Sequence, residues 1–426
     1  MSAPISKTIL PSGMTLLTQP LPDRNTVSVA VWVRTGARDE SQERQGITHF
    51  IEHMMFKGTA VRDAKAIAAS LESLGGHLDA FTTREQVCYT ARVLSEHLPQ
   101  AIDVLADITG RSKFDPADIQ REKSVVKEEI LSYEDNPEEK VGDQLSALAW
   151  GGHPLGRPIL GVAESVDALD AATLREDFTR HYRPDQLVIA AAGGLTPEEL
   201  SALVARSFTP PAGEAPGRDG APGTYVASMR HDVQDLQQLY LSLGTRAVPY
   251  LDPRRHALVI LETLLGGGMS SRLFQTIREE AGLAYSVFSS LDFMRDGGLL
   301  SIQMGVSPDR AREALNLLRA ELERLVTDGP DEAEVEATRM QIKGSVLIGQ
   351  ESTSGRMYHL ARQELYTGGY TSPEEQVERI LAVTRDDVAA LAAEFLAPER
   401  FALAALGPAP GGVLGPADWP VAVATD

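Results

Sequence analysis

The sequence predicts an α+β fold of two related halves, each with a mostly antiparallel sheet that carries helices on one face. Three observations support this prediction. Strand-like and helix-like stretches occur in both halves, a Pro- and Gly-rich stretch divides the chain almost equally, and two helix-patterned segments are weakly similar to each other. With 426 residues, 43% of them hydrophobic, the chain can bury more than one core.

Hydrophobic periodicity places the elements of each half. In the first half, alternating apolar residues over 27–33 predict a strand, and the stretches 64–74 and 95–105 have the spacing of amphipathic helices. In the second half, 239–243 predicts another strand and 256–265 another helix.

The stretch 208–223 is rich in Pro and Gly and has almost no large apolar residue, which is typical of a linker. We therefore expect one domain over residues 1–207, a linker over 208–224 and a second domain over 225–426. The tail 407–426, with Pro and Gly scattered through it, is expected to be extended or poorly ordered.

Weak internal similarity indicates a duplication. The segment 118–127 runs parallel to 334–343, but Thr338 and Ser345 stand where the first half has carboxylates. The stretch 259–263 keeps Glu262 and contains no histidine. We therefore expect no metal site in the second half.

The segment His49-Phe-Ile-Glu52-His53 carries the most specific chemical signal in the chain. Residues i and i+4 of a helix lie one turn apart on the same face, so both imidazoles could bind one ion beside the Glu52 carboxylate. The order His-x-x-Glu-His is the inverted form of a zinc-peptidase motif. The alternative is a half-buried helix whose imidazoles hydrogen-bond to neighbouring carbonyl groups.

A catalytic zinc site needs a third protein ligand and a fourth position for water. The helix-patterned stretch 118–130 offers carboxylates at Glu122, Glu128 and Glu129. Glu122 and Glu129 are two helical turns apart and share a face, which suits one ligand and one carboxylate that accepts the N–H of a ligating imidazole. The alternative is a charged, solvated helix, and this interpretation is preferred for Glu128.

The stretches 46–59 and 76–85, followed by Glu122 and Glu129, resemble the pitrilysin/insulinase family of zinc peptidases. The branch that they resemble contains the catalytic subunit of the mitochondrial processing peptidase and its bacterial relatives. The resemblance extends from about residue 5 to about residue 408, nearly the whole chain.

This resemblance implies a clamshell of two halves with one Zn²⁺ per chain. His49, His53 and Glu129 would be its ligands, and Glu122 would be an accessory acidic residue. Glu52 would take a proton from the bound water and deliver it to the leaving amine.

The resemblance also implies residues that bind substrate. Arg278 and Tyr285 would donate hydrogen bonds where an oxyanion develops. Ala80 and Phe81 would lie along the substrate backbone. Asp79 departs from the family pattern, because many relatives have Asn there and an ionised carboxylate cannot donate a hydrogen bond.

Composition excludes several other classes of function. The net charge of −20 argues against nucleic-acid binding and favours basic peptide ligands, although it could equally serve solubility. No apolar run is long enough to span a membrane, and the first residues lack a targeting pattern, so we expect a cytoplasmic protein without a membrane partner. The lone Cys88 is expected to be a small buried residue.

Together these features predict a zinc endopeptidase that hydrolyses unfolded peptides or presequence-like segments inside a closed chamber formed by a homodimer. The alternative is a non-catalytic scaffold, like the core subunits of respiratory complexes that share this fold. A scaffold predicts broken ligands, and here all three ligands and the base are present.

Overall fold

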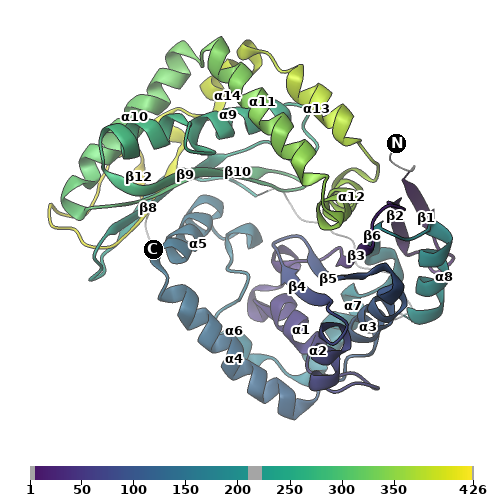
Figure 1. Cartoon of the computed structure of the whole chain (residues 1–426). Helices are drawn as coiled ribbons and strands as arrows, with labels where there is room; N and C mark the ends of the chain where they lie inside the picture. Colours follow the sequence, from purple (N-terminus) through teal and green to yellow (C-terminus); the bar gives the residue numbers. More distant parts are fainter. Residues whose placement is uncertain (1–4, 210–222, 425–426) are drawn as a thin grey trace. The chain divides into compact units, whose positions relative to one another are not determined.

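The computed structural model describes residues 5–209 and 223–424, which form two compact units (Figure 1). The first unit draws on Met1–Leu131, Pro158–Gly220 and Ile348–Thr371, and the second on Ser132–Arg157, Ala221–Leu347 and Ser372–Asp426.

The first unit is built on a six-stranded sheet in the order β1-β2-β6-β3-β5-β4. Its neighbours are antiparallel except for the parallel pair β2–β6. The strands are β1 (Ser6–Ile9), β2 (Thr15–Pro20), β3 (Thr26–Val33), β4 (His77–Thr82), β5 (Val87–Leu94) and β6 (Leu187–Gly193). The helices are α1 (Ile47–Met55), α2 (Ala64–Glu72), α3 (Leu98–Arg111), α4 (Pro116–Glu134), α6 (Ala163–Ala168), α7 (Ala171–His181), α8 (Pro197–Ser207) and α12 (Thr353–Thr367).

Strand β3 shows why this sheet is covered on both faces. Val29 and Val31 belong to the large core that also contains apolar residues of α1, α3 and α8. Ala30 and Trp32 point to the other face, where they pack with Met357 and its neighbours on α12. A strand in which both alternating sets are apolar has to be buried on both sides.

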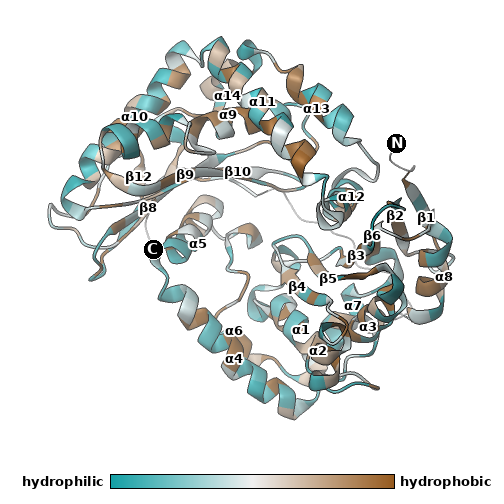
Figure 2. Cartoon of the chain, in the orientation of Figure 1, coloured by the Kyte–Doolittle hydropathy of each residue, from teal (hydrophilic) through white to brown (hydrophobic). Residues whose placement is uncertain are grey.

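The second unit repeats the arrangement with a sheet in the order β12-β7-β11-β8-β10-β9. Here β12–β7 and β7–β11 are parallel, and the other neighbours are antiparallel. The strands are β7 (Ser228–Asp232), β8 (Leu239–Arg246), β9 (Ala284–Phe293), β10 (Gly298–Val306), β11 (Ala402–Leu406) and β12 (Ala422–Val423). The helices are α5 (Pro137–Trp150), α9 (Arg255–Gly266), α10 (Ala311–Asp328), α11 (Glu332–Gly349), α13 (Pro373–Leu381) and α14 (Arg385–Phe395), with a π-helical segment at Phe274–Glu280. Figure 2 shows the mixture of hydrophilic and hydrophobic residues on α10, whose buried residues recur every three or four positions.

Each unit takes one helix from the opposite half of the sequence. Helix α5 precedes the predicted linker, yet Val141 and Leu145 on it pack with Ala402 and Leu406 of β11 in the second unit. Helix α12 follows the linker and covers the sheet of the first unit. The linker predicted at 208–224 lies mostly outside the described residues, and the domain boundaries stay predictions.

The expected α+β fold with two related, mostly antiparallel sheets is confirmed, and both sheets are mixed. The helices were expected on one face of each sheet, but the second face also carries a helix, α12 in the first unit and α5 in the second. The five strands and helices predicted from periodicity are present within a few residues of their expected bounds. The described part of the tail is mostly irregular backbone, but it is not loose throughout, because Trp419 is fully buried in the second core and β12 pairs with β7. None of the helices in the described ranges is both long and apolar enough to cross a membrane.

Candidate metal centre

Helix α1 is fixed at its beginning by an unusual backbone turn. Gly46 precedes the helix with φ +83, and a Cβ there would lie 2.4 Å from the Leu160 carbonyl oxygen, so only glycine fits. The buried carboxyl group of Glu40 accepts hydrogen bonds of 2.8 Å from the amides of Gly46 and Thr48. A side chain from outside the helix therefore satisfies two amides at its N-terminus.

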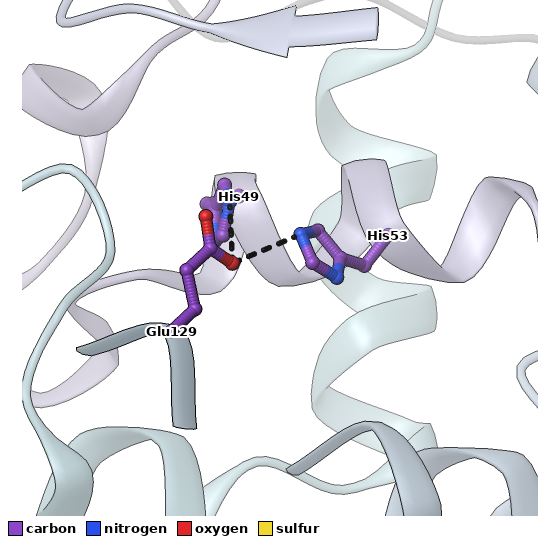
Figure 3. A group of neighbouring side chains, drawn as sticks. All are labelled: His49, His53 and Glu129. Carbon is purple, nitrogen blue, oxygen red and sulfur yellow. Dashed lines mark ion pairs between the residues drawn. The ribbon is translucent and has the colours of Figure 1, made fainter. Parts of the chain in front are cut away.

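The structure brings His49, His53 and Glu129 together, as the sequence predicted (Figure 3). His49 and His53 lie one turn apart on α1, with ring centroids 4.4 Å apart, and Glu129 reaches them from α4. Glu129 Oε2 lies 3.7 Å from His49 Nε2 and 3.4 Å from His53 Nε2. No other group of three such side chains with this spacing is found in the residues that the structure describes.

These distances fit a zinc ion. Zinc lies about 2.0–2.2 Å from nitrogen and oxygen ligands, so two ligand atoms at tetrahedral angles are roughly 3.3–3.6 Å apart. The two observed separations from Glu129 Oε2 are 3.4 and 3.7 Å. Two imidazoles and one carboxylate are a ligand set that leaves the fourth position of a catalytic zinc open.

Glu122 holds the second histidine in place. Its Oε1 lies 2.8 Å from His53 Nδ1, and its Oε2 lies 2.7 Å from Lys57 Nζ. Burial alone would raise the pKa of Glu122, but the hydrogen bonds with His53 and Lys57 lower it overall. Because an ionised carboxylate only accepts, His53 Nδ1 carries a proton, and Nε2 is the ring nitrogen left to bind a metal. Lys57 lies just after the end of α1, and no sequence pattern pointed to it.

The two imidazoles differ in their environments. Burial alone would lower the pKa of His53, but its hydrogen bond with Glu122 and the nearby carboxylates raise it overall. Burial, with a smaller contribution from the neighbouring His53, lowers the pKa of His49 to about 3, so His49 is neutral at pH 7. Its Nδ1 is buried and has no hydrogen-bond partner within the described ranges. A neutral imidazole is the form that binds metal.

Glu52 lies on the same helix and is held by Thr82. The Thr82 hydroxyl on β4 donates a 2.5 Å hydrogen bond to Glu52 Oε2. Burial raises the pKa of Glu52, while the Thr82 hydrogen bond opposes this shift. Thr82 lies within the 76–85 stretch that carried the family resemblance, but only the fold reveals that it contacts Glu52.

Strand β4 forms one edge of its sheet. Ala80 is half-buried there, and its amide donates a 2.9 Å hydrogen bond to the exposed Asp79 carboxylate. The Phe81 ring packs against Trp32 and Tyr358 on the α12 side of the sheet. The roles predicted for Ala80 and Phe81 remain predictions.

Arg278 and Tyr285 lie in the second unit. Arg278 belongs to the π-helical segment, and its guanidinium carbon lies 4.6 Å from the Phe274 ring centroid and 5.0 Å from that of Tyr285. Tyr285 is 81% exposed at the start of the edge strand β9. Their predicted contact with substrate stays a prediction. No sequence feature pointed to Phe274, whose ring packs against the Arg278 guanidinium.

Comparisons with known proteins agree with this geometry. Residues 15–163 match the family model described as insulinase (peptidase family M16), and residues 168–342 match the model described as the peptidase M16 inactive domain. The chain therefore belongs to the insulinase family of peptidases.

Relatives of similar length carry the name zinc protease. An uncharacterised zinc protease of Mycobacterium leprae is 38% identical over 96% of this chain and 92% of its own length. The uncharacterised zinc protease YmxG of Bacillus subtilis is 36% identical over 93% of this chain and 97% of its own length.

Two solved structures share the fold. A protease from Helicobacter pylori matches 96% of this chain and 100% of its own with a TM-score of 0.90 at 20% identity. A peptidase M16 inactive domain from Pseudomonas fluorescens matches 95% of this chain and 98% of its own with a TM-score of 0.88 at 21% identity.

Proposed function

We propose that this protein is a zinc-dependent endopeptidase. The observation that carries the proposal is the position of Glu52, a buried carboxylate on the helix that also bears His49 and His53, close to Glu129 from α4. The relatives named zinc proteases support the same reaction class. A bound zinc ion would polarise a peptide carbonyl and lower the pKa of an attacking water.

The chain's own residues would divide the remaining work. Glu52 accepts the proton of the attacking water and transfers it to the leaving amine, and Thr82 fixes the orientation of its carboxylate. Glu122 keeps His53 in the tautomer whose Nε2 can bind metal. Proton transfer by a positioned side chain typically contributes about 10²–10⁴-fold in rate.

A peptide would bind in extended form along the free edge of β4, beside Ala80 and Phe81. Arg278 and Tyr285 would stabilise the developing oxyanion. Their stacked arrangement and the exposure of Tyr285 leave donors available for such a contact.

We further propose a homodimer that encloses unfolded, preferably basic, peptides or presequence-like segments in the cytoplasm. The negative net charge supports the preference for basic substrates. A monomeric mass by light scattering at micromolar concentration would contradict the dimer. A cleavage rate on basic peptides that does not change with salt would contradict electrostatic attraction.

The test is the incubation of purified protein with unfolded peptides of graded length, followed by mass spectrometry of the products. We expect internal cleavage that a chelator abolishes and zinc restores, and no cleavage by the variant His49→Ala. Stoichiometric zinc binding without cleavage of any peptide would instead favour the non-catalytic scaffold.

A further inference from the structure

Strand β4 has a free edge close to the proposed catalytic base. It is the last strand of its sheet, and Thr82 at its end donates a hydrogen bond to Glu52. Extended peptides can add to such an edge through backbone hydrogen bonds. A peptide that binds along β4 would therefore pass beside Glu52.

The hairpin between β4 and β5 fixes which backbone groups reach this edge. Thr83 follows β4 and donates its amide to the Gln86 carbonyl across the turn at 2.8 Å. In an antiparallel pair, successive residues alternately direct their backbone groups toward the partner strand and away from it. Asp79 and Phe81 therefore direct theirs toward β5, whereas Ala80 directs its amide and carbonyl to the free edge.

The Ala80 amide is engaged by the residue before it. It donates a 2.9 Å hydrogen bond to Asp79 Oδ1. The only ion-pair partner of this carboxylate in the described ranges is His77, whose Nε2 lies 3.8 Å from Asp79 Oδ2. Both side chains are exposed, so this pairing contributes little. A peptide carbonyl can accept the Ala80 N–H only when the Asp79 carboxylate leaves it.

Aromatic rings lie on the same face of the strand as the Asp79 side chain. Side chains two residues apart share a face, so Asp79 and Phe81 both point to the α12 side of the sheet. The half-buried Phe81 ring lies 6.2 Å from that of Tyr358, which is also half-buried. A Lys or Arg side chain can pack its aliphatic stem against such rings and extend its charge to a carboxylate.

We propose that Asp79 selects peptides that place a Lys or Arg side chain on the α12 face of β4. The cation draws the carboxylate away from the Ala80 amide, and this amide then pairs with the peptide backbone. The inference rests on the proposed function, because it names the substrate residue that the same site prefers. Since adjacent residues of an extended peptide point to opposite faces, the preference falls on one peptide position or on positions two apart.

The experiment measures peptide binding to the full-length, zinc-loaded Glu52→Gln protein, which does not consume its ligand. A single Lys is moved along a neutral fluorescent peptide, each position has a Gln counterpart, and affinity is read by fluorescence anisotropy. The salt concentration is about 0.15 M, which largely screens distant charges. We expect the Lys peptide to bind about threefold to fivefold more tightly at the preferred position, as a partly exposed ion pair supports.

Three substitutions at Asp79 separate its charge from its hydrogen bond. Asp79→Asn should reduce the ratio of Lys to Gln affinities to about one, and Asp79→Lys should favour Glu over Gln at the same position. Asp79→Ala should bind the Gln peptides about twofold or more tightly than its parent, because the Ala80 amide is then free. The side chain is 63% exposed, so the fold should tolerate all three changes.

The matched control is Asp23→Asn, which removes an exposed carboxylate from the turn between β2 and β3 and should keep the preference for Lys. Cleavage of the same peptides by the protein with Glu52 intact is measured in parallel. Lys-dependent binding through Asp79 without any cleavage would contradict the peptidase and leave this proposal standing. The proposal is overturned by a preference that Asp79→Asn leaves unchanged, by an equal loss in Asp23→Asn, by equal preferences at adjacent positions, or by no peptide binding.

Discussion

Removal of the Glu122 charge should weaken zinc binding by a predictable amount. The Glu122 side chain is only 3% exposed and contacts both His53 and Lys57, so water cannot readily replace it. A hydrogen bond to a charged group contributes about 1.5–3 kcal/mol and a neutral one about 0.5–1.5 kcal/mol. In Glu122→Gln the amide oxygen can still accept from His53, and the difference of roughly 1–1.5 kcal/mol corresponds to about tenfold in affinity.

Glu122→Ala removes the acceptor altogether, and we expect a loss of about a hundredfold, at the upper end for residues that support metal ligands. The control is Glu128→Gln on the same helix. Glu128 is exposed and adjacent in sequence to Glu129, but it contacts neither histidine in the described structure.

The assay is competition for zinc against a chromogenic chelator at fixed pH, with the zinc content at saturation measured separately. We expect one zinc per chain in every variant and an affinity in the order wild type and Glu128→Gln, then Glu122→Gln, then Glu122→Ala. Affinities of both Glu122 variants within twofold of wild type would refute the reasoning, and so would an equal loss in Glu128→Gln.

Three further predictions concern Gly46 and Glu40 at the beginning of α1 and Phe274 in the second unit. Gly46→Ala should lower both the thermal midpoint and the zinc affinity. The φ of +83 at this residue strains any side chain, and a Cβ would lie 2.4 Å from the Leu160 carbonyl oxygen. A thermal midpoint and a zinc affinity equal to those of wild type would contradict this. Burial raises the pKa of Glu40 from 4.5 to about 8, so its contribution to stability is complete below pH 4.5 and is lost as the pH rises through 8. Thermal midpoints from pH 5 to 8 should therefore fall more steeply in wild type than in Glu40→Gln, and parallel curves would refute this. Phe274→Ala should lower peptidase kcat by several-fold through misplacement of Arg278, while Phe274→Leu retains most activity and zinc content stays constant; equal kcat in both variants would speak against a positioning role.

The local part of the site could be predicted because it depends on helical spacing. His49 and His53 are four residues apart on one helix, so any helix over 47–55 places them on one face. Glu129 could be predicted as the third ligand only from the family resemblance, because helical spacing alone left more than one carboxylate of α4 as a candidate. The partners Thr82, on β4, and Glu40, which precedes α1, come from elements whose approach depends on packing.

The exchange of helices between units could not be predicted for a similar reason. The apolar faces of α5 and α12 show that each helix packs against a hydrophobic surface, but periodicity does not identify the sheet that provides this surface. The buried Trp419 was missed because the Pro and Gly residues around it are typical of loops, and a loop can still carry one large side chain into a core.

The most direct test of the central claim compares Glu52→Gln with wild type for zinc content and peptide cleavage in parallel preparations. The amide can still accept a hydrogen bond from Thr82 but cannot take a proton from water. We predict one zinc per chain in both proteins and a loss of cleavage of about 10²-fold or more in the variant. Undiminished cleavage by a zinc-loaded Glu52→Gln protein would contradict the account.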